Sequence, residues 1–195
     1  MDNEIQNLFS QNVGEYNYII RDGADEFLVN FCKTNQPKNI LEIGTAYGYS
    51  AYLMATSCDC TITTIELDKN KVEIAKQNIE KVGLSSKINF ICGDAKEKIQ
   101  TLTQKYDLIF LDGPKGQYIK YLPTLIELLN SGGYLVADNV YYLGRIFKQG
   151  TIPHKYRTIV NNLRKFIEQI KTNEKLQTTL YNIGDGISVS KKIKQ

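Results

Sequence analysis

Tryptophan is absent from this sequence of 195 residues, histidine occurs once, as His154, and cysteine occurs four times. A single histidine argues against a zinc site of mixed cysteine and histidine ligands. Cys58 and Cys60 are separated by one residue, which is not the spacing of a zinc knuckle or of a redox motif. We therefore expect reduced thiols in or near the core of a cytoplasmic protein at all four positions, Cys32, Cys58, Cys60 and Cys92.

Long apolar runs are also missing. The longest, such as 108–111 and 135–137, fall far short of the roughly 20 residues that a membrane helix needs. The N-terminus is polar and acidic, without the basic start and apolar stretch of a secretory signal, so we expect no membrane partner. Hydrophobic residues make up 42% of the chain and charged residues 23%, which excludes a disordered chain. The length suits one domain, residues 1–195.

Negative charge is scarce in one segment. The formal net charge is +3, but residues 141–171 contain seven basic residues and one acid, Glu168, which gives +6 there and −3 elsewhere. Such a local excess indicates an anionic partner at one place. A solvated basic helix face is the alternative. The basic residues are Arg145, Lys148, Lys155, Arg157, Arg164, Lys165 and Lys171.

Apolar, β-branched segments alternate with amphipathic ones along the chain. This alternation predicts an α/β fold, with a mostly parallel sheet covered by helices on both faces. Gly184-Asp185-Gly186 between two alternating segments predicts a C-terminal antiparallel hairpin. We expect strands at 39–43, 61–66, 88–92, 106–111, 134–137, 178–183 and 187–192, and helices at 2–14, 23–34, 50–57, 69–82, 95–103, 118–129 and 158–170.

A glycine turn follows the first expected strand, where Gly44 and Gly48 lie in the run Leu41–Ser50. Glycine permits a tight turn and a close approach to a ligand. Glu66 ends the second strand, where a carboxylate can accept both hydroxyls of a ribose. The spacing G-x-x-x-G lacks the glycine that serves a pyrophosphate, so a ligand with a ribose and no phosphate fits better. A plain strand-to-helix turn is the alternative.

Oxygen ligands follow two later strands. Asp112 comes after the fourth strand, and Asp138 and Asn139 come after the fifth. In an open parallel sheet these strand ends lie at the edge where ligands bind. Two carboxylates and an amide suit Mg²⁺, Ca²⁺ or Mn²⁺. The alternative is that these residues only cap helices or turns.

The run E-I-G-T-A-Y-G-Y-S at residues 42–50 resembles the first motif of class I methyltransferases, and closely that of the metal-dependent catechol and caffeoyl-coenzyme-A O-methyltransferases. The resemblance extends from Tyr18 through the hairpin. It implies a Rossmann-like class I methyltransferase fold with seven strands, a homodimer, S-adenosylmethionine as cofactor, and Mg²⁺ or another divalent cation at Asp112, Asp138 and Asn139. The cofactor residues that it implies are Ile20, Glu42, Gly44, Gly48, Ser50, Glu66, Asp94, Ala95 and Asp112.

Lys115 follows Asp112 at the Asp-x-x-Lys spacing that places a lysine beside the acceptor hydroxyl in this family. The resemblance implies that Lys115 is the catalytic base. A metal lowers the pKa of an acceptor oxygen, and a lysine can take the proton. We expect a neighbouring cation to lower the pKa of the lysine too. A solvated surface lysine is the alternative.

Within the family, the chain resembles most the branch of bacterial tRNA 5-hydroxyuridine methyltransferases, which form 5-methoxyuridine at the wobble position. The matches are Lys115–Tyr118, Asp138–Val140, the basic segment and Gly184–Lys192. This implies a tRNA anticodon loop as partner, with Tyr141, Tyr142 and Phe147 available for stacking on bases. A small catechol is the alternative acceptor. A non-catalytic cofactor-binding protein would lack Asp112, Asp138 or Lys115. The residues expected to bind tRNA are Arg145, Lys148, Arg157 and Arg164.

Overall fold

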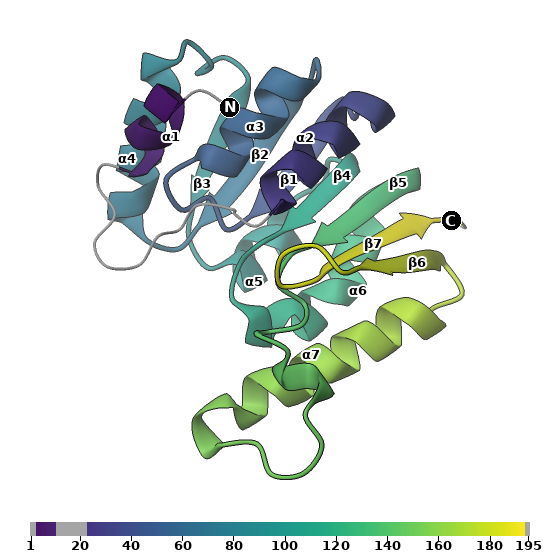
Figure 1. The fold of residues 1–195 in the computed structure, drawn as a ribbon. Coiled ribbons are helices and arrows are strands. Elements are labelled where there is room, and N and C mark those ends of the chain that lie inside the picture. Colours follow the sequence, from purple (N-terminus) through teal and green to yellow (C-terminus); the bar gives the residue numbers. More distant parts are fainter. Residues whose placement is uncertain (1–2, 11–22, 194–195) are drawn as a thin grey trace.

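The computed structural model describes residues 3–10 and 23–193. A central sheet with helices on both faces organises them (Figure 1). The sheet has seven strands in the order β3-β2-β1-β4-β5-β7-β6. β7 pairs antiparallel with β5 and β6, and the other pairings are parallel. This confirms the expected fold class. The strands are β1 Asn39–Ile43, β2 Thr61–Glu66, β3 Ile88–Cys92, β4 Tyr106–Leu111, β5 Leu129–Ala137, β6 Leu176–Tyr181 and β7 Ile187–Lys192.

The helices of the described residues divide between the two faces of the sheet. One face carries α1 Asn3–Ser10, α2 Ala24–Asn35, α3 Tyr49–Ser57 and α4 Lys69–Lys81. The other carries α5 Ala95–Lys98, α6 Tyr118–Leu128 and α7 His154–Thr172. Short 3₁₀ turns are η1 Ile99–Thr101, η2 Lys115–Gln117 and η3 Arg145–Phe147. None of these described helices is both long and apolar enough to cross a bilayer.

Two hydrophobic cores lie on opposite faces of the sheet, and β4 contributes to both. Its Leu108 and Phe110 pack with α2 and α3, whereas Ile109 and Leu111 pack with α6 and α7. Successive side chains of a strand point to opposite faces, so a strand buried on both faces is apolar at every position. The continuous apolar run 108–111 of β4 fits its central place in the sheet.

Several element boundaries differ from the sequence expectation, and the largest differences are at β5, α5 and α7. β5 begins at Leu129 rather than at residue 134. Ser131, Gly132 and Gly133 therefore lie inside the strand, and a Cβ added at Gly133 would stand 3.1 Å from the backbone oxygens of Tyr106 and Asp107. β6 ends at Tyr181 rather than at residue 183. α7 begins at His154, directly after Pro153, a residue that commonly precedes or starts a helix.

The N-terminal arm and the cysteines were partly as expected. The expected helix 2–14 is observed over Asn3–Ser10, and residues 2 and 11–14 lie outside the described residues. Cys32, Cys58 and Cys60 are buried free thiols, as predicted, whereas Cys92 is exposed. The expectation that Cys92 lies near the core was wrong, because it ends β3, the edge strand of the sheet.

The carboxyl ends of the parallel strands β1, β2, β4 and β5 meet at one edge of the sheet (Figure 1). Beyond this edge the chain between β5 and α7, with the first turn of α7, projects from the body of the protein. We call residues 141–157 the basic projection, because they include Arg145, Lys148, Lys155 and Arg157 and no acidic residue. The candidate site lies between the strand ends and this projection.

Candidate active site

A cleft of about 740 Å³ opens at the carboxyl ends of the strands. Its lining falls into two parts. The glycine half comes from the ends of β1, β2 and β3 and contains Gly44, Thr45, Ala46, Ser50, Glu66, Leu67, Asp94 and Ala95. The carboxylate half comes from the ends of β4 and β5 and from the hairpin turn, and contains Asp112, Lys115, Asp138, Asn139, Tyr142, Leu143 and Asp185.

Gly44 holds the glycine half against the neighbouring strand. Its backbone is left-handed, with φ +103°, and an added Cβ would lie 2.5 Å from the backbone oxygen of Asp112. The glycine is therefore required by the close approach of β4, as well as by any ligand in the cleft. Gly48, with φ +90°, precedes α3 and packs against Ala75 and Ile79 of α4. It does not line the cleft.

Glu42 lies beneath the cleft, fully buried in β1. The Ser50 hydroxyl donates to its Oε1, and the Thr64 hydroxyl donates to its Oε2 at 2.5 Å. The Thr64 and Thr45 hydroxyls are also hydrogen bonded to each other at 2.5 Å. Burial raises the pKa of Glu42 to about 7, against these hydrogen bonds. Sequence reasoning missed Thr45 and Thr64, because nothing local shows that they share a buried network with Glu42.

Glu66 occupies the position expected for a ribose ligand, and it also shapes the turn. Its Oε2 accepts from the Ala46 amide at 3.0 Å, and its Oε1 accepts from the Asp68 amide at 3.1 Å. Each carboxylate oxygen has a second lone pair, so Glu66 can still accept from a ligand. Asp94 lines the cleft and caps α5 by accepting from the Lys96 amide at 2.8 Å.

Two further points complete the glycine half. Leu67, 69% exposed, also lines the cleft, and the sequence analysis did not single it out. Ile20, expected to contact the cofactor, lies outside the described residues.

The carboxylate half brings the three expected metal ligands together. Leu111 and Ala137 are paired across β4 and β5, so Asp112 and Asp138 follow neighbouring strand ends. The Asp138 amide donates to the Leu111 oxygen at 3.0 Å. Buried Tyr118 braces both ends, since its hydroxyl lies 3.0 Å from the Leu111 oxygen and 3.3 Å from the Asp138 oxygen. Sequence reasoning assigned Tyr118 no role of its own.

Lys115 contacts the carboxylates directly. Its Nζ donates to Asp112 Oδ1 at 2.5 Å, and both side chains are mostly buried. Burial lowers the pKa of Lys115, but the charges of Asp112 and Asp138 outweigh it and hold the pKa above its usual range. The protein side chains alone thus hold the pKa of Lys115 high, opposite to the lowering that was expected. A neighbouring cation would be needed to lower that pKa for Lys115 to serve as a base.

The donor set fits a hard divalent cation. Asp138 is 3% exposed, and burial and then the charge of Asp112 raise its pKa to about 6. Two neighbouring carboxylates, one of them buried, are costly unless positive charge compensates them. Lys115 supplies one positive charge for the pair. Within residues 3–10 and 23–193 no three His, Cys, Asp or Glu side chains form a metal-binding group. Asn139 lines the cleft beside Asp138, to which its Nδ2 donates at 3.3 Å, and would supply its amide oxygen as the third ligand.

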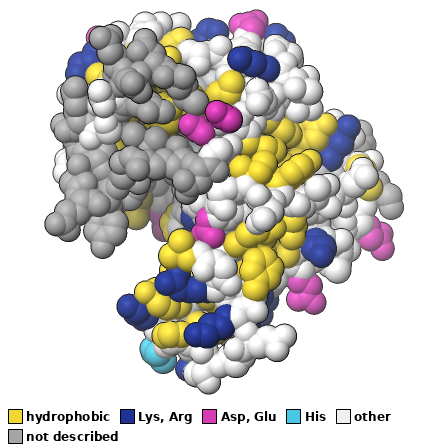
Figure 2. All heavy atoms as spheres, viewed as in Figure 1, with side chains coloured by type: hydrophobic (Ala, Val, Ile, Leu, Met, Phe, Trp, Pro, Cys, Tyr) yellow, Lys and Arg dark blue, Asp and Glu magenta, His cyan; other side chains and the backbone are white. Residues whose placement is uncertain are grey.

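The basic projection borders the carboxylate half. The Arg145 guanidinium lies over the rings of Tyr142, at 5.4 Å, and Tyr156, at 4.3 Å. Leu143 and Phe147 are 74% and 63% exposed. Figure 2 shows dark-blue basic side chains gathered with yellow hydrophobic ones on this projection, at the bottom of the view.

The four expected tRNA-binding residues differ in their surroundings. Lys148 and Arg157 are exposed. Arg164 instead donates to the backbone oxygens of Ile146, at 2.8 Å, and Lys148, at 2.6 Å, and so fastens the projection to α7. Of the C-terminal lysines matched by the resemblance, Lys192 is buried and donates to the Ile126 and Leu129 oxygens, both at 2.8 Å.

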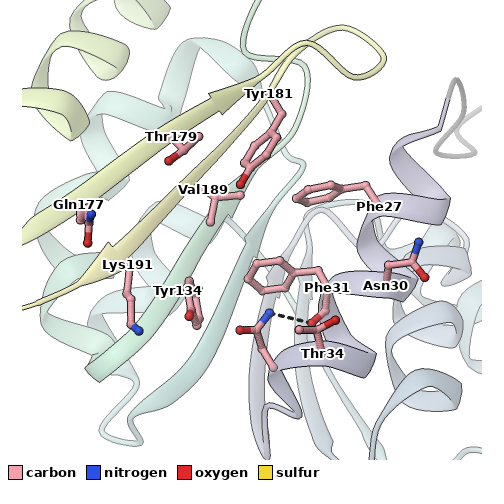
Figure 3. A pocket seen from close by; sticks show the side chains of 11 residues that line it. Phe27, Asn30, Phe31, Thr34, Tyr134, Gln177, Thr179, Tyr181, Val189 and Lys191 are labelled. Atoms are coloured by element: carbon pink, nitrogen blue, oxygen red, sulfur yellow. Dashed lines mark hydrogen bonds between the residues drawn. The ribbon is translucent and has the colours of Figure 1, made fainter.

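A second hollow, of about 430 Å³, lies between α2 and the β5-β7-β6 part of the sheet (Figure 3). Phe27, Phe31, Tyr134 and Tyr181 form most of its apolar surface and contact one another ring to ring. None of the predicted site residues lines it, so the chemistry expected from the sequence belongs to the larger cleft.

The chain is similar to known O-methyltransferases both in sequence and in structure. The O-methyltransferase family model matches residues 3–193. Caffeoyl-CoA O-methyltransferase 2 of Populus trichocarpa is 31% identical over 191 residues, which span 90% of this chain and 76% of that protein. Caffeoyl-CoA O-methyltransferase 2 of Eucalyptus globulus is 32% identical over 185 residues, which span 87% of this chain and 74% of that protein.

Solved structures with the same fold include two that contain SAH. The O-methyltransferase from Bacillus cereus matches with a TM-score of 0.87 and 22% identity, covering 98% of this chain and 92% of that one. The methyltransferase PaMTH1 of Podospora anserina matches with a TM-score of 0.87 and 22% identity, covering 98% of this chain and 87% of that one. At this identity the likeness establishes the fold.

Proposed function

The chain belongs to the O-methyltransferase family, and we propose that it transfers the methyl group of S-adenosylmethionine to an acceptor hydroxyl with the help of a divalent cation, Mg²⁺. One observation carries this proposal. The glycine half and the carboxylate half open into the same cleft, so a cofactor on the strand ends β1–β3 and an acceptor on the ends of β4 and β5 would meet there.

The glycine half would hold S-adenosylmethionine, which supplies the methyl group on its sulfonium. Glu66 would accept the ribose hydroxyls with its remaining lone pairs. Asp94, Ala95 and Leu67 line the same half and would contact the rest of the nucleoside. The SAH in the Bacillus cereus structure of the same fold supports this assignment.

Asp112, Asp138 and Asn139 would hold the cation, which when bound lowers the pKa of an acceptor hydroxyl. Lys115 Nζ, which contacts Asp112, would take the hydroxyl proton. The acceptor oxygen would then bond to the methyl carbon as the bond from that carbon to sulfur broke, and S-adenosylhomocysteine would leave. The chain contributes orientation and exclusion of water more than covalent chemistry, and the bracing of both strand ends by Tyr118 serves that task.

The acceptor that we propose is 5-hydroxyuridine at the wobble position of tRNA. Its O4 and 5-hydroxyl are neighbouring oxygens on a planar ring, which suits a cation with open positions. The basic projection supports this acceptor, because it places exposed Lys148 and Arg157 and the exposed ring of Phe147 next to the carboxylate half. Phosphates and splayed bases are bound by such side chains.

A small catechol-type molecule is the second candidate. The relatives named caffeoyl-CoA O-methyltransferases favour it, and a catechol ring also carries two neighbouring oxygens. The surface of the projection favours tRNA over a small neutral ring, which needs no array of cations outside the cleft. It does not separate tRNA from a coenzyme A thioester, because coenzyme A carries phosphates of its own.

Methyl transfer from labelled S-adenosylmethionine decides between these acceptors. Purified protein is incubated with tRNA from cells that lack the enzyme and, separately, with caffeic acid, each with and without EDTA. We expect labelling of tRNA that EDTA abolishes. Efficient labelling of caffeic acid with none of tRNA would refute the tRNA assignment, and full activity in EDTA would refute the role of the metal. Sedimentation equilibrium would test the homodimer, which stays a prediction, as does the cytoplasmic location.

A further inference from the structure

The segment Asn139–Gly144 has an unusual backbone. Asn139, Tyr142 and Leu143 have φ values of 53°, 51° and 55°, and Gly144 follows with φ 69°. Left-handed backbone is unfavourable for residues other than glycine, and persists only where the surrounding structure holds it. Asn139, Tyr142 and Leu143 also line the cleft. A segment strained in this way keeps its shape only if its surroundings hold it.

The hairpin turn Gly184–Gly186 provides the restraint, from more than 40 residues along the chain. Both carboxylate oxygens of Asp185 lie 2.7 Å from the Leu143 amide. The Tyr141 amide donates to the Asp185 oxygen at 2.9 Å, and the Val140 amide donates to the Gly186 oxygen at 3.0 Å. Three anchor points, at Val140, Tyr141 and Leu143, therefore tie the segment to the turn between β6 and β7.

Gly186 brings the turn close enough for these bonds. Its φ is +83°, and an added Cβ would lie 2.4 Å from the ring of Tyr141. The Tyr141 ring thus packs flat against the turn backbone. Among the described residues, Asp185 is the side chain of this turn that forms hydrogen bonds with the segment. A substitution at Asp185 can therefore release the segment without a steric clash.

We propose that Asp185 is a positioning residue for the acceptor end of the cleft. By holding the Leu143 amide, it fixes Asn139 at one end of the segment and Tyr142 near the other, both facing the cleft. This inference rests on the proposed function, because it assigns Asn139 to the cation and Tyr142 to the acceptor. Asp185 itself lines the cleft. Both of its oxygens accept from the Leu143 amide, which assigns it to the segment, and the comparison of Asp185→Ala with Asp185→Asn tests this role against a direct contact with the cation.

The test compares Asp185→Ala with Asp185→Asn, whose amide oxygen can still accept from Leu143. Asp59→Ala is the matched control, since it removes the same charge from an exposed acid whose ion-pair partners are Lys38 and Lys87. Four quantities are measured: hydrogen exchange of peptides spanning 139–148, Mn²⁺ affinity by electron paramagnetic resonance, SAH affinity by calorimetry, and the KM for tRNA or caffeic acid.

For Asp185→Ala we expect exchange of the Leu143 amide to be about tenfold faster and Mn²⁺ affinity to fall about tenfold, the lower end for loss of a partner that orients a metal ligand. The acceptor KM should rise, while SAH affinity stays within about twofold because the glycine half is separate. Asp185→Asn should recover most of both effects, and Asp59→Ala should match the wild type.

Two results would overturn the proposal. One is a loosened segment in Asp185→Ala with unchanged Mn²⁺ affinity and acceptor KM. The other is an Asp185→Asn protein that keeps the Leu143 amide protected yet binds Mn²⁺ as poorly as Asp185→Ala, which would make Asp185 a direct ligand. If the wild type methylates neither acceptor, the proposed function fails, while the exchange and Mn²⁺ measurements, which need no acceptor, still decide the role of Asp185.

Discussion

The two halves of the cleft are held by different means. In the glycine half, Gly44 packs against the backbone of Asp112, and Glu42, Ser50, Thr45 and Thr64 satisfy one another in a buried network. In the carboxylate half, charged groups face one another, and three residues other than glycine keep left-handed backbone under restraint from a distant hairpin. The first half is held mainly by packing and buried hydrogen bonds, with one left-handed residue other than glycine, Ala46 at φ 45°, whereas the second half combines balanced charge with three such residues.

This difference has a functional meaning under the proposed mechanism. A cofactor that is the same for every reaction can be bound by a surface built into the sheet. An acceptor and a cation need a surface whose charges are compensated only when they bind, and whose shape can differ between relatives. Substitutions should therefore separate the two halves: some should remove catalysis and keep cofactor binding, and others should do the reverse.

The largest expected effect is on the carboxylate half. Asp138→Asn, or removal of the cation with EDTA, should lower turnover by about 1000-fold or more, which corresponds to about 4 kcal/mol. Asp138 is a buried carboxylate in the proposed donor set, and the change keeps its shape. SAH affinity, measured by calorimetry, should stay within about twofold. If Asp138→Asn lost turnover and SAH affinity to the same extent, the two halves of the cleft would not be separable.

Next in size is the packing of the glycine half. Gly44→Ala should destabilise the protein by about 3 kcal/mol, since left-handed strain is joined by a collision with the Asp112 backbone. Gly83→Ala is the matched control, because Gly83 also has positive φ, +72°, but an added Cβ there meets nothing within 4 Å. It should cost about 1 kcal/mol. Urea unfolding of both variants measures the difference, and equal losses would contradict the packing argument.

The buried network of the glycine half predicts a pH effect of similar size. The pKa of Glu42 is about 7 in the folded protein, against an ordinary value of 4.5. The folded state therefore binds the proton more tightly, so this contribution to stability is present below pH 4.5 and is lost as pH rises towards 7, by about 3 kcal/mol. Glu42→Gln should lack this loss. Urea unfolding at pH 5 and pH 7.5 measures the stability of Glu42→Gln relative to wild type. We expect this difference in stability to rise with pH, and a constant difference would refute the raised pKa of Glu42.

Local patterns located residues of both halves: Asp112, Lys115, Asp138 and Asn139 all line the cleft, whereas Gly48 of the expected cofactor residues does not. Gly44 and Glu66 could be located because a strand, a turn and a helix follow one another in sequence, and Asp112 and Asp138 because each ends an apolar run. The sequence predicted Asp185 only as part of a hairpin turn, and Arg164 as a residue that binds tRNA. Their contacts with Leu143 and Ile146 join segments 42 and 18 residues apart, and a tertiary contact of this kind leaves no periodic signal.

Glu66→Ala should act on the glycine half alone. We expect it to weaken S-adenosylmethionine binding by about 1.5–3 kcal/mol, the range for hydrogen bonds to a charged group. Part of this loss would come from the turn, because Glu66 also holds the Ala46 amide. Calorimetry with SAH measures the affinity, and Mn²⁺ affinity should stay unchanged. If a folded Glu66→Ala protein binds SAH as the wild type does, Glu66 has no part in the cofactor site.

The smallest expected effect lies outside both halves, on the basic projection. Arg157 is exposed on the first turn of α7, so Arg157→Ala should leave the cleft intact and remove about one phosphate contact. The KM for tRNA should rise by a few-fold, and the slope of log affinity against log salt should fall by about one unit. The kcat at saturating tRNA and the KM for caffeic acid should not change. Lys81→Ala, the loss of an exposed lysine at the end of α4, is the charge-matched control. Arg164→Ala should behave differently, because Arg164 fastens the projection through the Ile146 and Lys148 oxygens and its loss should also affect the position of Tyr142. If Arg157→Ala and Lys81→Ala have equal salt slopes, the projection does not bind the phosphates, and the charge that favours tRNA over a catechol is only a solvated helix face.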